Sequence, residues 1–98
     1  MAKQSKKTIK PGKEIIASKV NGFRKKLLKI IDQGIKEIVM DFGGVKTVDS
    51  MGLGVIIAAN NTVEESGGKI SLINVPEEFY ALCKAMRLDG YFDVKTVE

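Results

Sequence analysis

The chain has 98 residues, of which 44% are apolar and 29% are charged, a balance that excludes a disordered or fibrous protein and fits one globular domain. One cysteine excludes an internal disulfide, and the absence of histidine removes the usual general base and the commonest metal ligand. No apolar run approaches the roughly 20 residues that span a bilayer, and the N-terminus lacks the pattern of a signal peptide. We therefore expect a cytoplasmic protein that does not insert into membranes.

The net charge of +4 is unevenly distributed along the chain. Residues 1–13 hold five of the sixteen basic residues and no acidic residue. Residues 14–98 therefore hold eleven basic and all twelve acidic residues. The basic excess therefore belongs to the N-terminus. We expect a partly disordered basic tail over residues 1–9 and a single domain over residues 10–98. Since the tail carries no aromatic side chain for base stacking, direct binding of nucleic acid is not predicted.

The first predicted helix covers residues 18–33. Its apolar residues recur at steps of three and four, the spacing of one helix face, at Val20, Phe23, Leu27, Ile30 and Ile31. The other face is strongly basic and carries Lys19, Arg24, Lys25, Lys26 and Lys29. Gly34 is the expected stop signal. The residues before Ser18 add at most one or two short strands, because residues 8–12 leave little room before the turn.

Strands and helices are then predicted in alternation. Residues 35–42 form a short, nearly continuous apolar run, which is typical of a strand covered on both faces. A second extended piece over residues 45–48 leads into a helix that should end before Gly67. Residues 69–75 form another strand, and a last short strand lies within residues 91–97. Between them, Pro76 suits the first turn of a helix whose buried face is predicted to comprise Phe79, Leu82, Cys83 and Met86.

This alternation predicts an α/β fold with a mixed, mostly parallel β-sheet packed against α-helices in right-handed βαβ units. The N-terminal edge strand is expected to be short or missing. A shortened edge leaves backbone groups unpaired, so a homodimer formed by pairing with a second copy is an open alternative. Folding is expected to depend on six core residues, namely Phe23, Leu27, Val39, Ile56, Leu72 and Leu82.

Residues 47–54 join the end of a predicted strand directly to the start of a helix. Partner and ligand sites gather at such carboxyl ends of strands in open α/β sheets. Either Asp49 or Ser50 could cap the helix by accepting hydrogen bonds from its first N–H groups. Gly52 and Gly54 each cost about 1 kcal/mol relative to alanine inside a helix. Close packing on the sheet, or a bare surface that another protein approaches, would explain them.

Catalytic and cofactor sites are not predicted. Ser50 has no histidine to activate it as a nucleophile, and residues 52–54 lack the third glycine of a dinucleotide fingerprint. A magnesium cluster of Asp41, Asp49 and Asp93 is disfavoured, because Asp41 is predicted to lie inside its strand and not at the strand's end. We therefore expect no enzyme activity, no cofactor and no metal ion.

The run Asp49-Ser50-Met51-Gly52-Leu53-Gly54 resembles the Asp-Ser-(Ser/Thr)-Gly-Leu-Gly signature of the bacterial anti-sigma factor antagonists, a group within the STAS domain family. The strands predicted before and after it are similar to that family's in order and spacing, and the likeness covers residues 11–97. The resemblance implies a single STAS-type domain. It also implies a phosphorylation site at Ser50 and a partner-docking segment comprising Asp49, Ser50, Met51, Gly52, Leu53 and Gly54.

The resemblance further implies a partner-switching cycle. In that family the unmodified protein binds a partner that is both anti-sigma factor and serine kinase, and so frees a sigma factor. Phosphorylation of Ser50 would switch the protein off until a serine phosphatase restores it. Met51 replaces the family's usual serine or threonine, which affects partner choice. The alternative is a STAS adaptor or scaffold subunit of a signalling or lipid-transport complex, without regulated phosphorylation.

Overall fold

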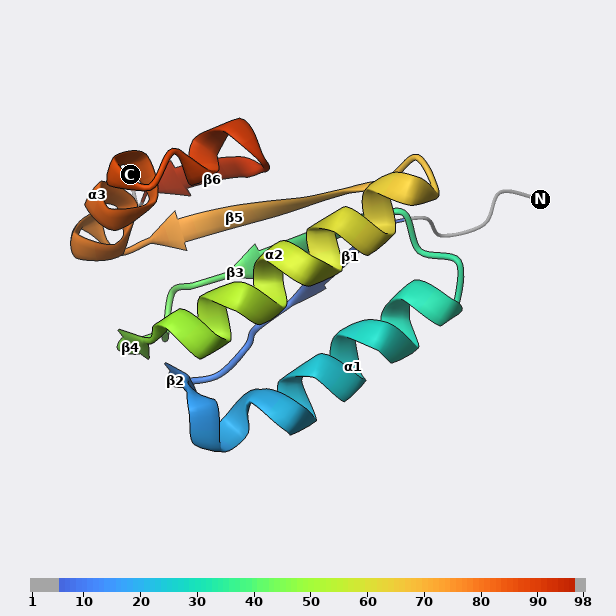
Figure 1. Ribbon diagram of the computed structural model, residues 1–98, viewed down its shortest axis with the longest axis horizontal. Coiled ribbons are helices and arrows are strands. Elements are labelled where there is room, and N and C mark those ends of the chain that lie inside the picture. Colours follow the sequence, from blue (N-terminus) through green and yellow to red (C-terminus); the bar gives the residue numbers. More distant parts are fainter. Residues whose placement is uncertain (1–5, 97–98) are drawn as a thin grey trace.

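Strands and helices alternate along residues 6–96, the part of the chain that the computed structural model describes (Figure 1). In chain order the elements are β1 (Lys6–Ile9), β2 (Glu14–Ile15), the 3₁₀ turn η1 (Ala17–Lys19), α1 (Val20–Asp32), β3 (Glu37–Asp41), β4 (Thr47–Val48), α2 (Ser50–Glu65), β5 (Lys69–Val75), α3 (Glu77–Ala85), the 3₁₀ turn η2 (Leu88–Gly90) and β6 (Asp93–Thr96). The predicted α/β class is confirmed.

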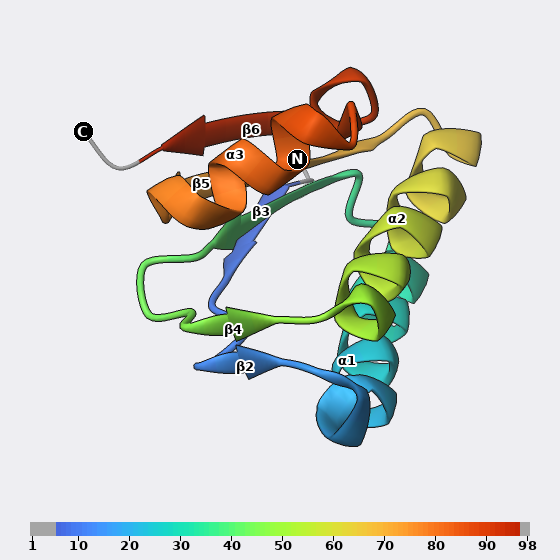
Figure 2. The ribbon, with the colours of Figure 1, turned by 60° about the vertical axis from the view of Figure 1, so that its left-hand side comes forward.

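The strands form two parallel sheets. The larger sheet has the order β1-β3-β5-β6, and the smaller one pairs β2 with β4. Figure 2 shows the small sheet set apart from the large one, next to the N-terminal ends of α1 and α2. In the large sheet each strand lies beside its predecessor, so right-handed crossovers place all the connecting helices on one face. The core lies between that face and the helices, and contains Leu27, Ile38, Met40, Ile56, Ile70 and Leu72.

Among residues 6–96, no helix covers the opposite face of the large sheet. In β3, Ile38 and Met40 are buried against the helices, whereas Glu37, Val39 and Asp41 are only half-buried. The prediction of a strand covered on both faces is therefore wrong for β3, because the strand order leaves no crossover to cover the second face. Val39 consequently does not belong to the core. The open face mixes charged, polar and apolar side chains, among them Lys6, Thr8, Glu37, Lys69, Ser71, Ile73, Asp93 and Lys95.

The N-terminal edge of the large sheet corrects the predicted domain boundary. Residues 6–9 form β1 and pair with β3, so they are not part of a tail, and the rest of the predicted tail lies outside the described residues. An edge strand needs little apolar surface, and here Ile9 alone enters the core while the lysines stay in water. The edge strand is short, as expected.

The predicted buried face of α1 is confirmed except at half-buried Ile31, and that of α3 is confirmed only in part. The residues Val20, Phe23, Leu27 and Ile30 of α1 are buried. In α3, Phe79 and Cys83 are buried, but the predictions for Leu82 and Met86 are wrong, because these side chains are 42% and 49% exposed. This short helix is anchored along one narrow line, where the Phe79 ring stacks on Phe42 at 5.3 Å. Side chains on either side of that line face water.

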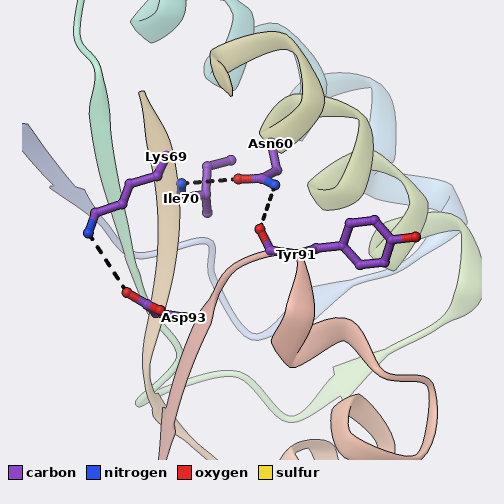
Figure 3. Close-up of polar contacts among 5 residues, drawn as sticks. All are labelled: Asn60, Lys69, Ile70, Tyr91 and Asp93. Atoms are coloured by element: carbon purple, nitrogen blue, oxygen red, sulfur yellow. Dashed lines mark hydrogen bonds and ion pairs between the residues drawn. The ribbon is translucent and has the colours of Figure 1, made fainter. Parts of the chain in front are cut away.

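A buried amide connects α2 to the C-terminal part of the sheet (Figure 3). The Asn60 side chain is fully buried in the middle of α2. Its Oδ1 accepts a hydrogen bond from the Ile70 backbone N–H at 3.2 Å, and its Nδ2 donates to the Tyr91 carbonyl at 2.9 Å. Asn60 therefore satisfies two backbone groups that come from β5 and from the turn before β6.

Candidate functional site

Asp49 fixes the junction between β4 and α2. Its Oδ1 accepts from the Gly52 N–H and its Oδ2 from the Ala17 N–H, each at 2.9 Å. Its own backbone N–H donates to the carbonyl of Ile15 in β2, at 3.2 Å. One carboxylate thus caps α2 and ties it to η1. The hydrogen bonds from Gly52 and Ala17 lower the pKa of Asp49 below the ordinary carboxyl value.

Ser50 is the first residue of α2 and is exposed. Of the two candidate caps that the sequence offered, Asp49 fills the role, and within residues 6–96 no hydrogen bond engages the Ser50 hydroxyl. The hydroxyl therefore lies unengaged at the positive end of a 16-residue helix, whose dipole favours a negative charge.

The two glycines of the segment have different roles. Gly52 is buried against β2, and a Cβ added there would overlap the Ile15 carbonyl group, 2.6 Å from its carbon atom. At Gly54 an added Cβ would meet nothing within 4 Å, and the residue is exposed. Close packing therefore explains Gly52, whereas Gly54 leaves a bare surface.

The segment presents only some of the predicted docking residues to a partner. Met51 is 57% exposed and, with Ser50 and Gly54, forms the accessible edge. Gly52 and Leu53 are buried, so their predicted place on the docking surface is corrected to a structural one. A helix begins at Ser50, and its 3.6-residue turn directs these two positions inward. Half-buried Asp49 holds the segment in place.

The exposed edge continues into a groove between α1 and α2. Ser50, Met51 and Gly54 line one part of it, together with Arg24 and Leu28 of α1. Sequence reasoning did not identify these two α1 residues as part of the site. The only available signal was an apolar Leu28 outside the predicted buried face of the helix.

The sequence model of the STAS domain matches residues 2–98. The chain belongs to the STAS domain family. A search of curated proteins found no relative of this STAS domain by sequence.

Solved structures confirm the fold of this STAS domain. The crystal structure of TM1081 from Thermotoga maritima, assigned as an anti-sigma factor antagonist, superposes with a TM-score of 0.87 at 22% identity, covering 95% of this chain and 80% of that one. The unphosphorylated form of the anti-sigma factor antagonist SpoIIAA gives 0.73 at 19% identity, covering 100% and 84%. The phosphorylated form of SpoIIAA from Bacillus gives 0.74 at 22% identity, covering 98% and 87%.

The other chemically interesting side chains of this STAS domain have structural partners. Asp41 lies at the end of β3, not inside it as predicted, and its Oδ1 accepts from the Asn74 side chain and the Gly43 N–H. These bonds lower the pKa of Asp41. Burial raises the pKa of the Cys83 thiol to about 11. Within residues 6–96 no group of three potential metal ligands comes together, and no helix there is long and apolar enough to cross a membrane.

Proposed function

We propose that this STAS domain is an anti-sigma factor antagonist controlled by phosphorylation of Ser50. The unmodified form binds an anti-sigma factor that is also a serine kinase, and so frees a sigma factor in the cytoplasm. The kinase then phosphorylates Ser50, the complex dissociates, and a serine phosphatase restores the hydroxyl. The role is one of regulated binding and not of catalysis.

The free hydroxyl of Ser50 is the observation that carries this proposal. A serine used as a helix cap would have its oxygen engaged, but here Asp49 accepts the capping hydrogen bond and Ser50 is left exposed. The surface beside it is formed by Met51 and Gly54, so a kinase can bring its catalytic site close to the hydroxyl.

A phosphoryl group at Ser50 is compatible with the fold and unfavourable for docking. It adds about −1.5 to −2 charges, which the N-terminal end of α2 stabilises through its dipole. The same charge lies next to the Asp49 carboxylate and adds bulk to the exposed edge. A partner that fits the unmodified edge therefore loses complementarity while the domain stays folded.

The proposal is tested by purifying the protein from its own cells, mapping phosphorylated residues by mass spectrometry and identifying the proteins that bind Ser50→Ala. We expect a kinase that phosphorylates Ser50 and binds Ser50→Asp at least about tenfold more weakly than Ser50→Ala. Ser66→Ala and Ser66→Asp, at the exposed far end of α2, are the matched controls and should bind alike.

Two outcomes contradict the proposal. One is equal affinity of Ser50→Ala and Ser50→Asp for the captured kinase, with circular dichroism showing both variants folded. The other is a Ser50 that is never modified during growth or stress, in a protein whose partners are transport or scaffold proteins. The second outcome would establish the adaptor role instead.

A further inference from the structure

The groove between α1 and α2 has a volume of about 400 Å³ and begins at Ser50. The two helices lie side by side and run in the same direction (Figure 1). Residues of both helices form the walls of the groove. On α1 these are Val20, Arg24, Leu27 and Leu28, and on α2 they are Ser50, Met51, Gly54, Val55, Ala58, Ala59 and Thr62. One charged side chain, Arg24, is among these lining residues.

Small side chains keep the groove open along α2. Gly54, Ala58 and Thr62 follow one another at four-residue steps, so they lie on one side of the helix, and all three are exposed. The Thr62 hydroxyl bonds to the Ala58 carbonyl at 3.1 Å, which engages this polar group within α2. From Ser50 to Thr62 the helix rises about 18 Å, the length of roughly three helical turns.

The backbone around the groove favours a helical occupant. The N–H and C=O groups of α1 and α2 are bonded within the helices, so an extended peptide would find no backbone partners there. A helix satisfies its own backbone and can insert side chains at i, i+3, i+4 and i+7 between two helices. The bare surface at Gly54 lets its backbone approach closely.

The charges beside the groove select an acidic occupant. From Ser50 to Val63, α2 carries no charged residue. The α1 wall carries Arg24, whereas the exposed residues Lys25, Lys29 and Asp32 of the same helix do not line the groove. An acidic residue on the occupant can therefore pair with Arg24, and it meets no charged residue on the α2 wall.

We propose that this groove binds an amphipathic helix of about three turns, with apolar residues toward the groove and acidic residues toward α1. The inference rests on the proposed function in one respect: the helix belongs to the kinase, and its seat beside Ser50 positions the hydroxyl for phosphorylation. The groove then recognises the partner, while the state of Ser50 decides whether recognition persists.

A stapled helical peptide tests the groove without the kinase. The probe is a fluorescent peptide of about 14 residues with leucines at i, i+4, i+7 and i+11 and glutamates on one flank; a matched peptide has lysines in place of the glutamates. We expect fluorescence anisotropy to show at least about tenfold tighter binding of the acidic peptide, with the preference weakening at high salt. Amide NMR shifts should map to Arg24, Leu28, Gly54 and Ala58.

Matched variants separate groove binding from non-specific attraction. Ala58→Trp should fill the groove and abolish peptide binding, whereas Asn61→Trp, on an exposed position of α2 outside the groove, should not. Arg24→Glu should weaken the acidic peptide about tenfold, and Lys26→Glu, which does not line the groove, should have a smaller effect. Equal effects within either pair, or no binding of the acidic peptide, overturn the proposal.

The kinase, once captured, distinguishes this inference from the proposed function. If Ala58→Trp loses the kinase while Asn61→Trp keeps it, the groove is the recognition site. If both variants bind the kinase and are phosphorylated on Ser50 as readily as the wild type, the groove proposal fails and the switch stands. If no kinase acts on Ser50, the switch fails, and the peptide experiment alone decides the groove. A medium-chain fatty acid is the competitor that tests for a lipid occupant. If it displaces the peptide at a concentration below that of the peptide, the proposal of a helical occupant is contradicted in favour of a lipid.

Discussion

The opposite roles of Gly52 and Gly54 predict alanine variants with stability changes of opposite sign. Alanine is favoured over glycine inside a helix by about 0.5–1 kcal/mol, and nothing lies within 4 Å of a Cβ at Gly54. Gly54→Ala should therefore raise the free energy of unfolding by that amount. For a domain of this size the melting temperature rises by about 2–8 °C.

Gly52→Ala gains the same helix propensity, but the added Cβ must displace the backbone of β2. Its Cβ would overlap the Ile15 carbonyl, whose oxygen accepts the Asp49 N–H, so the strand cannot retreat without losing that hydrogen bond. Overpacking of this kind costs about 1–3 kcal/mol or more. We expect Gly52→Ala to lower the free energy of unfolding by about 2 kcal/mol, after allowing for the propensity gain and the weakened hydrogen bond.

Urea unfolding of both variants and the wild type, followed by circular dichroism, measures the difference. A Gly52→Ala variant as stable as the wild type, or a Gly54→Ala variant destabilised by more than about 0.5 kcal/mol, would refute the assignment of the two glycines. The same proteins also report on docking. Because Gly54 faces the proposed partner, Gly54→Ala should bind the kinase more weakly despite its greater stability.

Three further predictions follow from burial and hydrogen bonding. Leu27→Ala should cost about 2–5 kcal/mol, because Leu27 is 1% exposed, whereas Leu82→Ala, at 42% exposure, should cost less than about 1 kcal/mol; chemical denaturation of both tests the core assignment. Asn60→Ala should lose about 1–3 kcal/mol, since it leaves a buried N–H and a carbonyl without partners; the matched exposed change Asn61→Ala should be nearly neutral, and equal losses would contradict the role given to the buried amide. Asp49→Asn should destabilise the protein most at neutral pH. The folded-state pKa of Asp49 is lowered, so its ionised form contributes stability above about pH 4, and this stability is lost as the pH falls through the folded-state pKa. An Asp49→Asn variant whose free energy of unfolding differs from that of the wild type by the same amount at about pH 7 and at about pH 3 would contradict this.

The order of the elements was predictable from periodicity, because each depends on local patterns. The buried face of α1 follows the three- and four-residue steps of Val20, Phe23, Leu27 and Ile30, and Gly34 lies just beyond the helix with a φ of +85°. The start of α2 was predictable because Asp49 is a strong capping residue followed by an apolar helix.

Features set by distant contacts were not predictable. The run that became β3 looks the same whether one face or both are covered, and the strand order of the whole sheet decides which. The position of β1 was not predicted, because its single core side chain, Ile9, is surrounded by lysines that an edge strand tolerates. The prediction that Leu82 of α3 is buried was wrong, because the spacing of apolar residues in a helix does not show how much of the helix surface its neighbours cover. The different roles of Gly52 and Gly54 likewise could not be predicted without knowing where β2 lies.

The hydrogen bonds of Asn60 connect α2 to β5 and to the turn before β6, so the stability of these elements is coupled. β6 lies at the edge of the large sheet and is the last element along the described part of the chain. The amide inside α2 gains its Tyr91 partner only when that final turn is in place. Opening of β6 therefore leaves an unpaired polar group within the helix that begins at Ser50, and fraying at one end of the protein weakens the element that carries the hydroxyl.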